Sequence, residues 1–194
     1  MYRSDMNSNK KIIMPGVQTF YVSKEETNCP LITEFIKISK KLKDLGVLEN
    51  ATATISFSYG KRILINGNVK DFGNIKREEL LEIADYDPIK KIMLILGPIE
   101  PKVETPVHWM VHHARNDVNT AIQINGENIV EKFGNKIPRT KKEYPPGTLE
   151  QAKEVLKILR DSKKLVIKNQ GVLFVANTVK EAEDLIIKTY EELK

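Results

Sequence analysis

The sequence predicts a single α/β domain, and three observations support that fold class. The chain has 194 residues, of which 41% are hydrophobic, so it is long enough for one domain with a sizeable core. Several segments carry apolar residues at helical spacing. Other short segments, either alternating or wholly apolar, occur in pairs on the two sides of a turn, as β-hairpins do.

The N-terminal part contributes little chemistry. Residues 1–9 are polar and are expected to form a flexible tail, while residues 10–194 form the domain. A short strand is expected around Ile12 or Phe20. A helix follows over residues 30–46, because its apolar side chains recur at helical spacing and a glycine ends it. Those side chains are Leu31, Phe35, Ile38, Leu42 and Leu45.

The next segments are predicted to be strands. A hairpin is predicted over residues 52–65, with its turn at residues 59–60. A second turn is predicted at residues 66–68. Residues 92–96 form a short apolar strand, which a Gly-Pro pair ends.

A helix and a strand then follow each other closely. Thr105 can cap the helix, and Pro106 suits its first turn because no amide hydrogen is needed there. The helix should end near Arg115. The strand after it has alternating side chains, which place Gln123 and Asn125 on the same face.

The rest of the chain is predicted to form a loop, a helix, a hairpin and a final helix. These are a basic loop with three prolines at residues 134–146, a helix capped by Thr148 and Gln151, strands at residues 165–167 and 172–175, and a helix capped by Thr178 and Glu181.

Composition excludes several classes of partner. The net charge is +5 and the isoelectric point about 9.1, but lysines are interleaved with glutamates on helix faces, which favours solvated surfaces over nucleic-acid binding. The single Cys29 rules out an internal disulfide and fits a reducing cytoplasm. Without a signal core or an 18-residue apolar run, the chain is expected to be cytoplasmic and not membrane-bound. Richness in Lys, Ile and Glu is compatible with a thermophile.

Four segments carry a family resemblance. ETPVHWMVHHARNDVNTAIQING resembles the central segment of the class II aldolase/adducin family, in which a catalytic Glu precedes a helix and a strand ends in His-x-His. RILINGNVKDFGNIKREELLEI resembles the family's ILITPSG segment with its following acidic helix. EYPPGTLEQAKEVLKIL and LVIKNQGVLFVANTVKEAEDL resemble its YxPPGS and LLxNHGV segments. Together they cover Leu31 to the C-terminus in the family's order, and they imply a three-layer fold with a central, mostly antiparallel sheet between helical layers.

The resemblance also implies a zinc site of three histidines, with a Glu as acid and base. The corresponding residues in this chain are Gln123, Asn125 and Gln170, and Glu104 occupies the acid/base position. An amide oxygen is a weak ligand for zinc, so we expect no zinc, no other cofactor, and no aldol chemistry that depends on a Lewis acid. For Glu104, the alternative is a carboxylate that is only stabilised by the helix dipole.

The resemblance places substrate-binding groups at Thr54, Asn66, Gly67, Asn68, Lys102 and Tyr144. Most of the family's phosphate-binding groups are changed here, and Lys102 stands where the family has a serine. Lys102 is alternatively a solvated lysine, and Tyr144 a loop residue packed on prolines.

Three histidines invite a replacement metal site. His108 and His112 lie one helical turn apart, but His113 points about 100° away, so the three cannot bind one ion. Packing or a subunit contact is the favoured role.

Three functions remain open. The chain could be a small-molecule-binding protein or pseudoenzyme that keeps the pocket and Glu104, with a carbonyl, sugar or sugar-phosphate-like ligand. It could be an aldolase-type lyase with an altered metal site or none. It could also be a non-catalytic assembly module like the adducin head. The resemblance also implies a homo-oligomer, a four-fold ring with its site at a subunit edge, because the family builds its site between neighbouring subunits.

Overall fold

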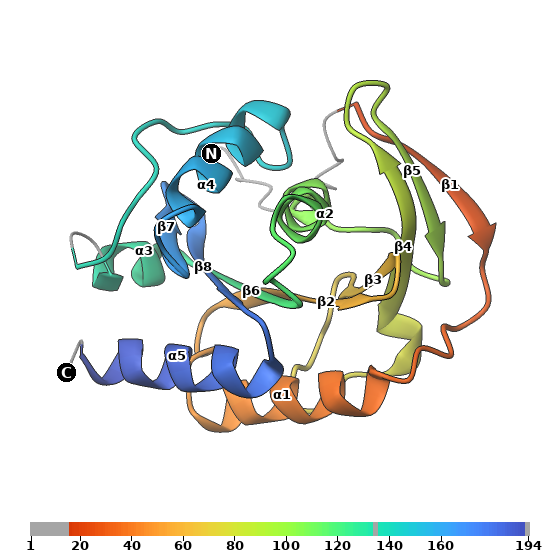
Figure 1. Ribbon diagram of the computed structural model, residues 1–194. Helices are drawn as coiled ribbons and strands as arrows, with labels where there is room; N and C mark the ends of the chain where they lie inside the picture. The colour runs from red at the N-terminus through yellow and green to blue at the C-terminus, as the bar shows by residue number, and fades with distance from the viewer. Residues whose placement is uncertain (1–15, 134–135, 193–194) are drawn as a thin grey trace, which may run out of the picture.

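A central sheet of eight strands organises the protein. The computed structural model describes residues 16–133 and 136–192. The strand order is β1-β5-β4-β3-β2-β6-β8-β7, and only β1 and β5 are parallel among these neighbours (Figure 1). The expected tail at residues 1–9 and the strand around Ile12 lie outside the described residues, whereas Phe20 lies in β1.

The strands are β1 (Gln18–Ser23), β2 (Thr52–Tyr59), β3 (Arg62–Asn66), β4 (Leu80–Asp87), β5 (Ile92–Leu96), β6 (Thr120–Asn125), β7 (Lys164–Ile167) and β8 (Gly171–Ala176). The α-helices are α1 (Ile32–Asp44), α2 (Thr105–Ala114), α3 (Glu127–Phe133), α4 (Leu149–Leu159) and α5 (Val179–Glu191), and a 3-10 turn, η1, spans Arg77–Glu79.

Helices cover both faces of the sheet and make three layers. One face packs against α1, α3 and α5, with Phe35, Phe57 and Phe174 in its core. The other packs against α2 and α4, with Val111 and Val155 in its core (Figure 1). The expectation of a mostly antiparallel sheet between helical layers is therefore confirmed.

Most predicted elements are present. The 30–46 helix is α1, and Phe35, Ile38 and Leu42 of its stripe are buried, whereas Leu45 is 44% exposed. The two hairpins are β2–β3 and β7–β8. The capping oxygens of Thr148 and Thr178 accept the amides of Gln151 and Glu181, as expected.

Three details differ from the sequence prediction. The N-cap of α2 is Glu104 rather than Thr105, and neither makes a side-chain cap, because the helix starts one residue earlier with Glu104 already in helical conformation. The acidic helix implied after residue 73 is only η1, followed by strand β4. Helix α3, which has seven residues, was not predicted.

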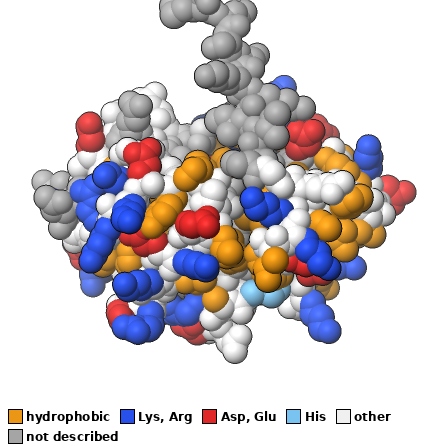
Figure 2. All heavy atoms as spheres, turned by 90° about the horizontal axis from the view of Figure 1, so that it is seen from above, with side chains coloured by type: hydrophobic (Ala, Val, Ile, Leu, Met, Phe, Trp, Pro, Cys, Tyr) orange, Lys and Arg blue, Asp and Glu red, His pale blue; other side chains and the backbone are white. Residues whose placement is uncertain are grey.

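The surface carries mixed charges. Basic and acidic side chains alternate over the face formed by α2 and α4, and hydrophobic side chains gather toward the side where β1 and β5 lie (Figure 2). Over the described residues, no helix has the length and apolar character needed to cross a membrane.

Candidate functional site

The register between β2 and β6 brings polar side chains together beneath α2. Thr54 lies opposite Gln123, and Thr52 lies opposite Asn125. Directly opposed residues in an antiparallel pair point to the same face. This face packs against α2 and is otherwise apolar, so the polar side chains form an island in a hydrophobic layer.

Two amides and one carboxylate form a connected chain in this island. Nε2 of Gln123 donates to Oδ1 of Asn125 over 2.8 Å, and Nδ2 of Asn125 donates to Oε1 of Glu104 over 2.6 Å. Glu104 is only 9% exposed. The prediction that Gln123 and Asn125 share a face near Glu104 is confirmed by these contacts.

The glycine of the β7–β8 turn is required for this arrangement. Gly171 lies opposite Asn125 in the sheet, and a Cβ atom on it would lie 2.6 Å from Oδ1 of Asn125. The backbone oxygen of Ile124 would lie even closer, so a larger residue at this position would disturb the pairing of β6 with β8 and the Asn125 amide with it.

Gln170 does not join the amide chain. Its Nε2 donates to the backbone oxygen of Tyr144 over 3.2 Å, and its own backbone oxygen accepts the amide of Gly126. The residue therefore lies beside the end of β6, while its side chain bonds to the loop before α4.

The residues at the implied ligand positions do not fit a zinc ion. The Asn125 oxygen already accepts a hydrogen bond, and Gln170 is bonded to Tyr144. Carboxamide oxygens are also poor zinc donors compared with imidazole nitrogen or thiolate. Within residues 16–133 and 136–192, no group of three or more His, Cys, Asp or Glu residues is arranged to hold a metal.

Buried polar atoms without partners occur on Glu104, on the first turn of α2 and on the strand β2 beneath it. In the described part of the chain, six buried side-chain polar atoms lack a hydrogen-bond partner. Four of them belong to this region: Thr54 Oγ1, Glu104 Oε2, Thr105 Oγ1 and His108 Nε2. Buried polar groups in proteins are almost always paired, so such a concentration needs an explanation.

Lys102 brings a positive charge to the same region. Its Nζ donates to the backbone oxygen of Ala53 over 3.0 Å. Burial lowers the pKa of the Lys102 amine, and the negative charge of Glu104 opposes that shift. The alternative of a merely solvated lysine does not describe this side chain.

The other residues assigned to substrate binding are placed differently. Asn66 is fully buried. Its side-chain NH₂ donates to the backbone oxygens of Ala53 and Gly67, and its side-chain oxygen accepts from the backbone amide of Ile55. Gly67 has no room for a side chain, because a Cβ atom would lie 2.8 Å from Ile99. Both positions therefore have a structural explanation.

Asn68 and Tyr144 lie away from the island. Asn68 is exposed beyond the end of β3. Tyr144 is half-buried and lines a groove of about 580 Å³ beside α4, together with basic residues such as Lys153 and Lys157.

Two of the three histidines converge on one serine. Oγ of Ser56 lies 2.7 Å from Nδ1 of His108 and 2.8 Å from Nε2 of His112. His113 is exposed and stacks on Trp109, with ring centroids 3.6 Å apart. As expected from helical spacing, the three imidazoles do not meet.

The directions of the hydrogen bonds determine the tautomers of His108 and His112. Nδ1 of His112 lies 3.1 Å from the backbone oxygen of Val118 and must donate to it, so Nε2 accepts from the Ser56 hydroxyl. The Ser56 oxygen then accepts from Nδ1 of His108. Nε2 of His108 is left as an unprotonated acceptor near Gln123.

Burial keeps both imidazoles neutral. Desolvation lowers the pKa of His108 to about 3, helped by electrostatic interactions with His112 and with the Lys102 amine and opposed by the Gln123 side chain. Desolvation likewise lowers the pKa of His112 to about 4, against the hydrogen bond to Val118.

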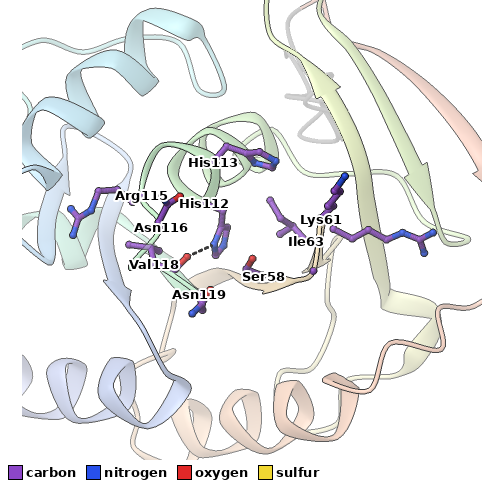
Figure 3. A pocket seen from close by; sticks show the side chains of 11 residues that line it. Ser58, Lys61, Ile63, His112, His113, Arg115, Asn116, Val118 and Asn119 are labelled. Atoms are coloured by element: carbon purple, nitrogen blue, oxygen red, sulfur yellow. Dashed lines mark hydrogen bonds between the residues drawn. The ribbon is translucent and has the colours of Figure 1, made fainter.

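The far end of α2 borders a separate cavity of about 240 Å³. His112 reaches into the space between α2 and β2, and His113, Ser58 and Asn119 also line it (Figure 3). His112 thus connects this cavity to Ser56 and His108. Sequence reasoning missed the role of Ser56, for which the only signal was its place on the face of β2 that turns toward α2.

Comparison with known sequences identifies a related family. Residues 33–124 match the family described as the Class II Aldolase and Adducin N-terminal domain. The chain is 24% identical over 165 residues to the L-fuculose phosphate aldolase of Methanocaldococcus jannaschii, with 77% of this chain and 86% of that protein covered.

Solved structures have the same fold. An L-fuculose 1-phosphate aldolase superposes with a TM-score of 0.70 at 18% identity, covering 87% of this chain and 84% of the other. The l-fuculose-1-phosphate aldolase from Thermus thermophilus gives a TM-score of 0.65 at 18% identity, covering 84% of this chain and 91% of the other. At such identities the similarity shows the fold alone.

Proposed function

Because the chain belongs to the class II aldolase and adducin family, we propose that it binds a small hydroxylated carbonyl compound around Glu104, without the family's zinc-dependent aldol chemistry. Sugars and sugar phosphates are the nearest ligand class, since the similar proteins are named for such substrates.

The carrying observation is that buried polar atoms without partners belong to Glu104, to the first turn of α2 and to the facing strand β2. Leaving a buried polar atom without a partner costs about 1–3 kcal/mol. Thr54, Glu104 and Thr105 each contribute one such atom, and Nε2 of His108 has the Gln123 side chain near it but no hydrogen bond of good geometry. A ligand or bound water that supplies the missing hydrogen bonds would remove these costs, so the cluster supports a binding site.

The chemistry of the unpaired atoms supports a hydroxylated ligand. Nε2 of His108 can only accept a hydrogen bond in the assigned tautomer, and an ionised carboxylate such as Glu104 also only accepts, whereas the threonine hydroxyls both donate and accept. A compound with adjacent hydroxyl groups can donate to the first two and accept from the threonines.

The loss of zinc chemistry is supported by the contacts of the amides. Asn125 directs its NH₂ group at Glu104 and its oxygen at Gln123, so it is organised to hold a carboxylate rather than a cation. The aldol mechanism of the family needs a Lewis acid on the substrate oxygen, and these side chains are poor at holding one.

A calorimetric and thermal-shift screen tests the proposal. A set of three- to six-carbon sugars, sugar phosphates and hydroxy-ketones is titrated into chelator-treated protein. Glu104→Gln removes the acceptor charge at the site, whereas Glu150→Gln, on the exposed side of α4, is the matched control. Binding to the parent and the control with at least tenfold weaker binding to Glu104→Gln is expected.

Two results would contradict the proposal. One is that no compound in the set binds the parent protein. The other is that binding appears only after zinc is added, which would restore the metal-dependent alternative.

We also propose that the protein is a homo-oligomer. Phe20 and Val22 on the edge strand β1 are 46% and 61% exposed, on a side where hydrophobic side chains gather (Figure 2). A second copy of the chain could cover such a surface, which supports association.

A further inference from the structure

We propose that Lys102 reacts covalently with carbonyl ligands, so that an imine on its Nζ takes over the activating role that a metal plays in the family. The inference rests on the proposed ligand site at Glu104. To that proposal it adds a reactive residue, Lys102, and a covalent bond to the ligand. It also narrows the ligand class to aldehydes and ketones that carry a neighbouring hydroxyl group.

The position of Lys102 carries the argument. The residue lies two positions before Glu104, and its Nζ reaches across to β2, where the backbone oxygen of Ala53 accepts its hydrogen bond over 3.0 Å. Asn66 donates to the same oxygen over 3.1 Å. The next residue of β2 is Thr54, whose hydroxyl is one of the unpaired buried atoms. The amine is therefore held at the border of the unpaired group.

The amine is not neutralised by an ion pair. Within the described part of the chain, Lys102 forms no ion pair with a carboxylate, and its one hydrogen bond goes to a neutral carbonyl. Its charge nevertheless influences the buried His108, whose pKa it lowers, and it is itself influenced by Glu104. The amine thus lies within electrostatic reach of both groups.

Partial burial favours the reactive form of the amine. Desolvation lowers the pKa of Lys102, which increases the fraction of neutral amine near pH 7, and a neutral amine is the form that attacks carbonyl carbon. Glu104 acts in the opposite direction, but it also offers an acid and base for the proton transfers that imine formation needs.

The reaction balances without an oxidant or reductant. The Nζ lone pair forms a bond to the carbonyl carbon, and the oxygen takes up a proton to give a carbinolamine. Loss of the hydroxyl group as water then gives the C=N bond. Protonated imine nitrogen withdraws electrons from the neighbouring carbon, and Glu104, whose charge already reaches the amine, is the carboxylate that would accept a proton there.

Borohydride trapping tests the proposal. The protein is incubated with glyceraldehyde or dihydroxyacetone, reduced with sodium borohydride, digested and analysed by mass spectrometry. Hydride adds to the imine carbon and leaves a stable secondary amine. We expect one adduct per chain on the peptide that contains Lys102, with at least tenfold less on exposed lysines such as Lys157.

Two variants and the parent protein distinguish a loss of imine formation from a loss of folding. Lys102→Arg keeps the charge but cannot form an imine, so it should lose the adduct, whereas Lys157→Arg should keep it. Peptide mapping of the parent needs no variant and stays informative if Lys102→Arg fails to fold. Labelling spread evenly over surface lysines, or unchanged in folded Lys102→Arg, would overturn the proposal.

Failure here differs from failure of the proposed function. If dihydroxyacetone stabilises both the parent and Lys102→Arg against heat but no adduct forms, the ligand site stands and the imine is rejected. If no carbonyl compound in the set stabilises the parent and none is trapped, both proposals are rejected.

Discussion

The Asn125 side chain donates a 2.6 Å hydrogen bond to Oε1 of Glu104, across 21 residues of sequence. A carboxylate that is only 9% exposed needs such a donor, because an unpaired buried charge is costly. The contact therefore links Asn125, at an implied metal-ligand position, to the burial of the Glu104 carboxylate.

Replacing Asn125 with alanine should destabilise the protein. The variant leaves Oε1 of Glu104 without its donor and also frees Nε2 of Gln123, at a cost of about 1–3 kcal/mol in the free energy of unfolding. Urea denaturation measures this. The control is Asn119→Ala, which removes an exposed contact with Asn177 and should cost about 0.5 kcal/mol or less. Equal effects for the two variants would show that Glu104 does not depend on Asn125.

Restoring histidines tests whether the implied ligand positions still converge. The combined variant Gln123→His, Asn125→His and Gln170→His should gain zinc binding of micromolar affinity or better, while the parent should carry well under one zinc per chain. Missing partners for the new imidazoles could cost about 10- to 100-fold each. Calorimetric titration and elemental analysis measure both.

Gln170 is the member of that set whose side chain must move furthest, because it bonds to Tyr144 rather than to the amide chain. A histidine there must turn away from the loop to reach the other two. A folded triple variant without added zinc affinity would mean that the three positions do not converge. Stoichiometric zinc in the parent would contradict the proposed loss of the metal.

The buried histidine pair should make stability depend on pH. In the unfolded chain a histidine titrates near pH 6.5, whereas the folded pKa values are lowered to about 3 for His108 and about 4 for His112. Between the unfolded pKa and the folded pKa values, the unfolded state therefore binds more protons than the folded state does. Stability is complete above pH 6.5 and falls as the pH falls toward 4, by about 1.4 kcal/mol per pH unit for each histidine.

Denaturation curves at pH 7, 6, 5 and 4.5 measure this slope, and His108→Gln or His112→Gln should flatten it. Nitrogen-15 NMR at pH 6 should show both rings neutral with the proton on Nδ1. A ring that is protonated at pH 6 would contradict the assigned hydrogen-bond directions.

Light scattering tests the oligomeric state. We expect a homo-oligomer, and the family resemblance favours a tetramer. We expect Val22→Lys on the exposed side of β1 to weaken it, because a charge there must be desolvated on association. The control is Lys24→Glu, just beyond the strand, where the side chain is exposed. Thr19→Lys on the same strand is unsuitable, because that side chain is partly buried. A monomer at high micromolar concentration would reject both the oligomer and any site shared between subunits.

Much of the fold follows from local sequence patterns. The spacing of apolar residues and the capping residues are enough to locate α1, α2, α4, α5 and both hairpins. Strand β4 escapes these rules, because Glu82, Asp85 and Asp87 interrupt its apolar residues, and its identity depends on pairing with β3 and β5. Helix α3 is too short for its period to stand out from the surrounding loop.

The candidate site is predictable only in part. Strand periodicity is enough to place Gln123 and Asn125 on one face, since that relation is local. The Ser56 contacts with His108 and His112 span 52 and 56 residues and depend on the packing of α2 over β2, which no local pattern encodes. The turn of Gln170 toward Tyr144 likewise depends on how the loop before α4 folds back.

The parallel pairing of β1 with β5 has a consequence for the order of folding. All other neighbouring strands are antiparallel, and four of those pairs, β2–β3, β3–β4, β4–β5 and β7–β8, join strands that are consecutive along the chain. Strand β1 must instead find a partner beyond α1, β2, β3 and β4, and closing a long loop is slow and entropically costly. Since β1 also lies at the edge of the sheet, it should be the last strand to join the sheet and the first to open. Amide hydrogens of β1 are then expected to exchange with solvent sooner than those of β6 in the middle of the sheet.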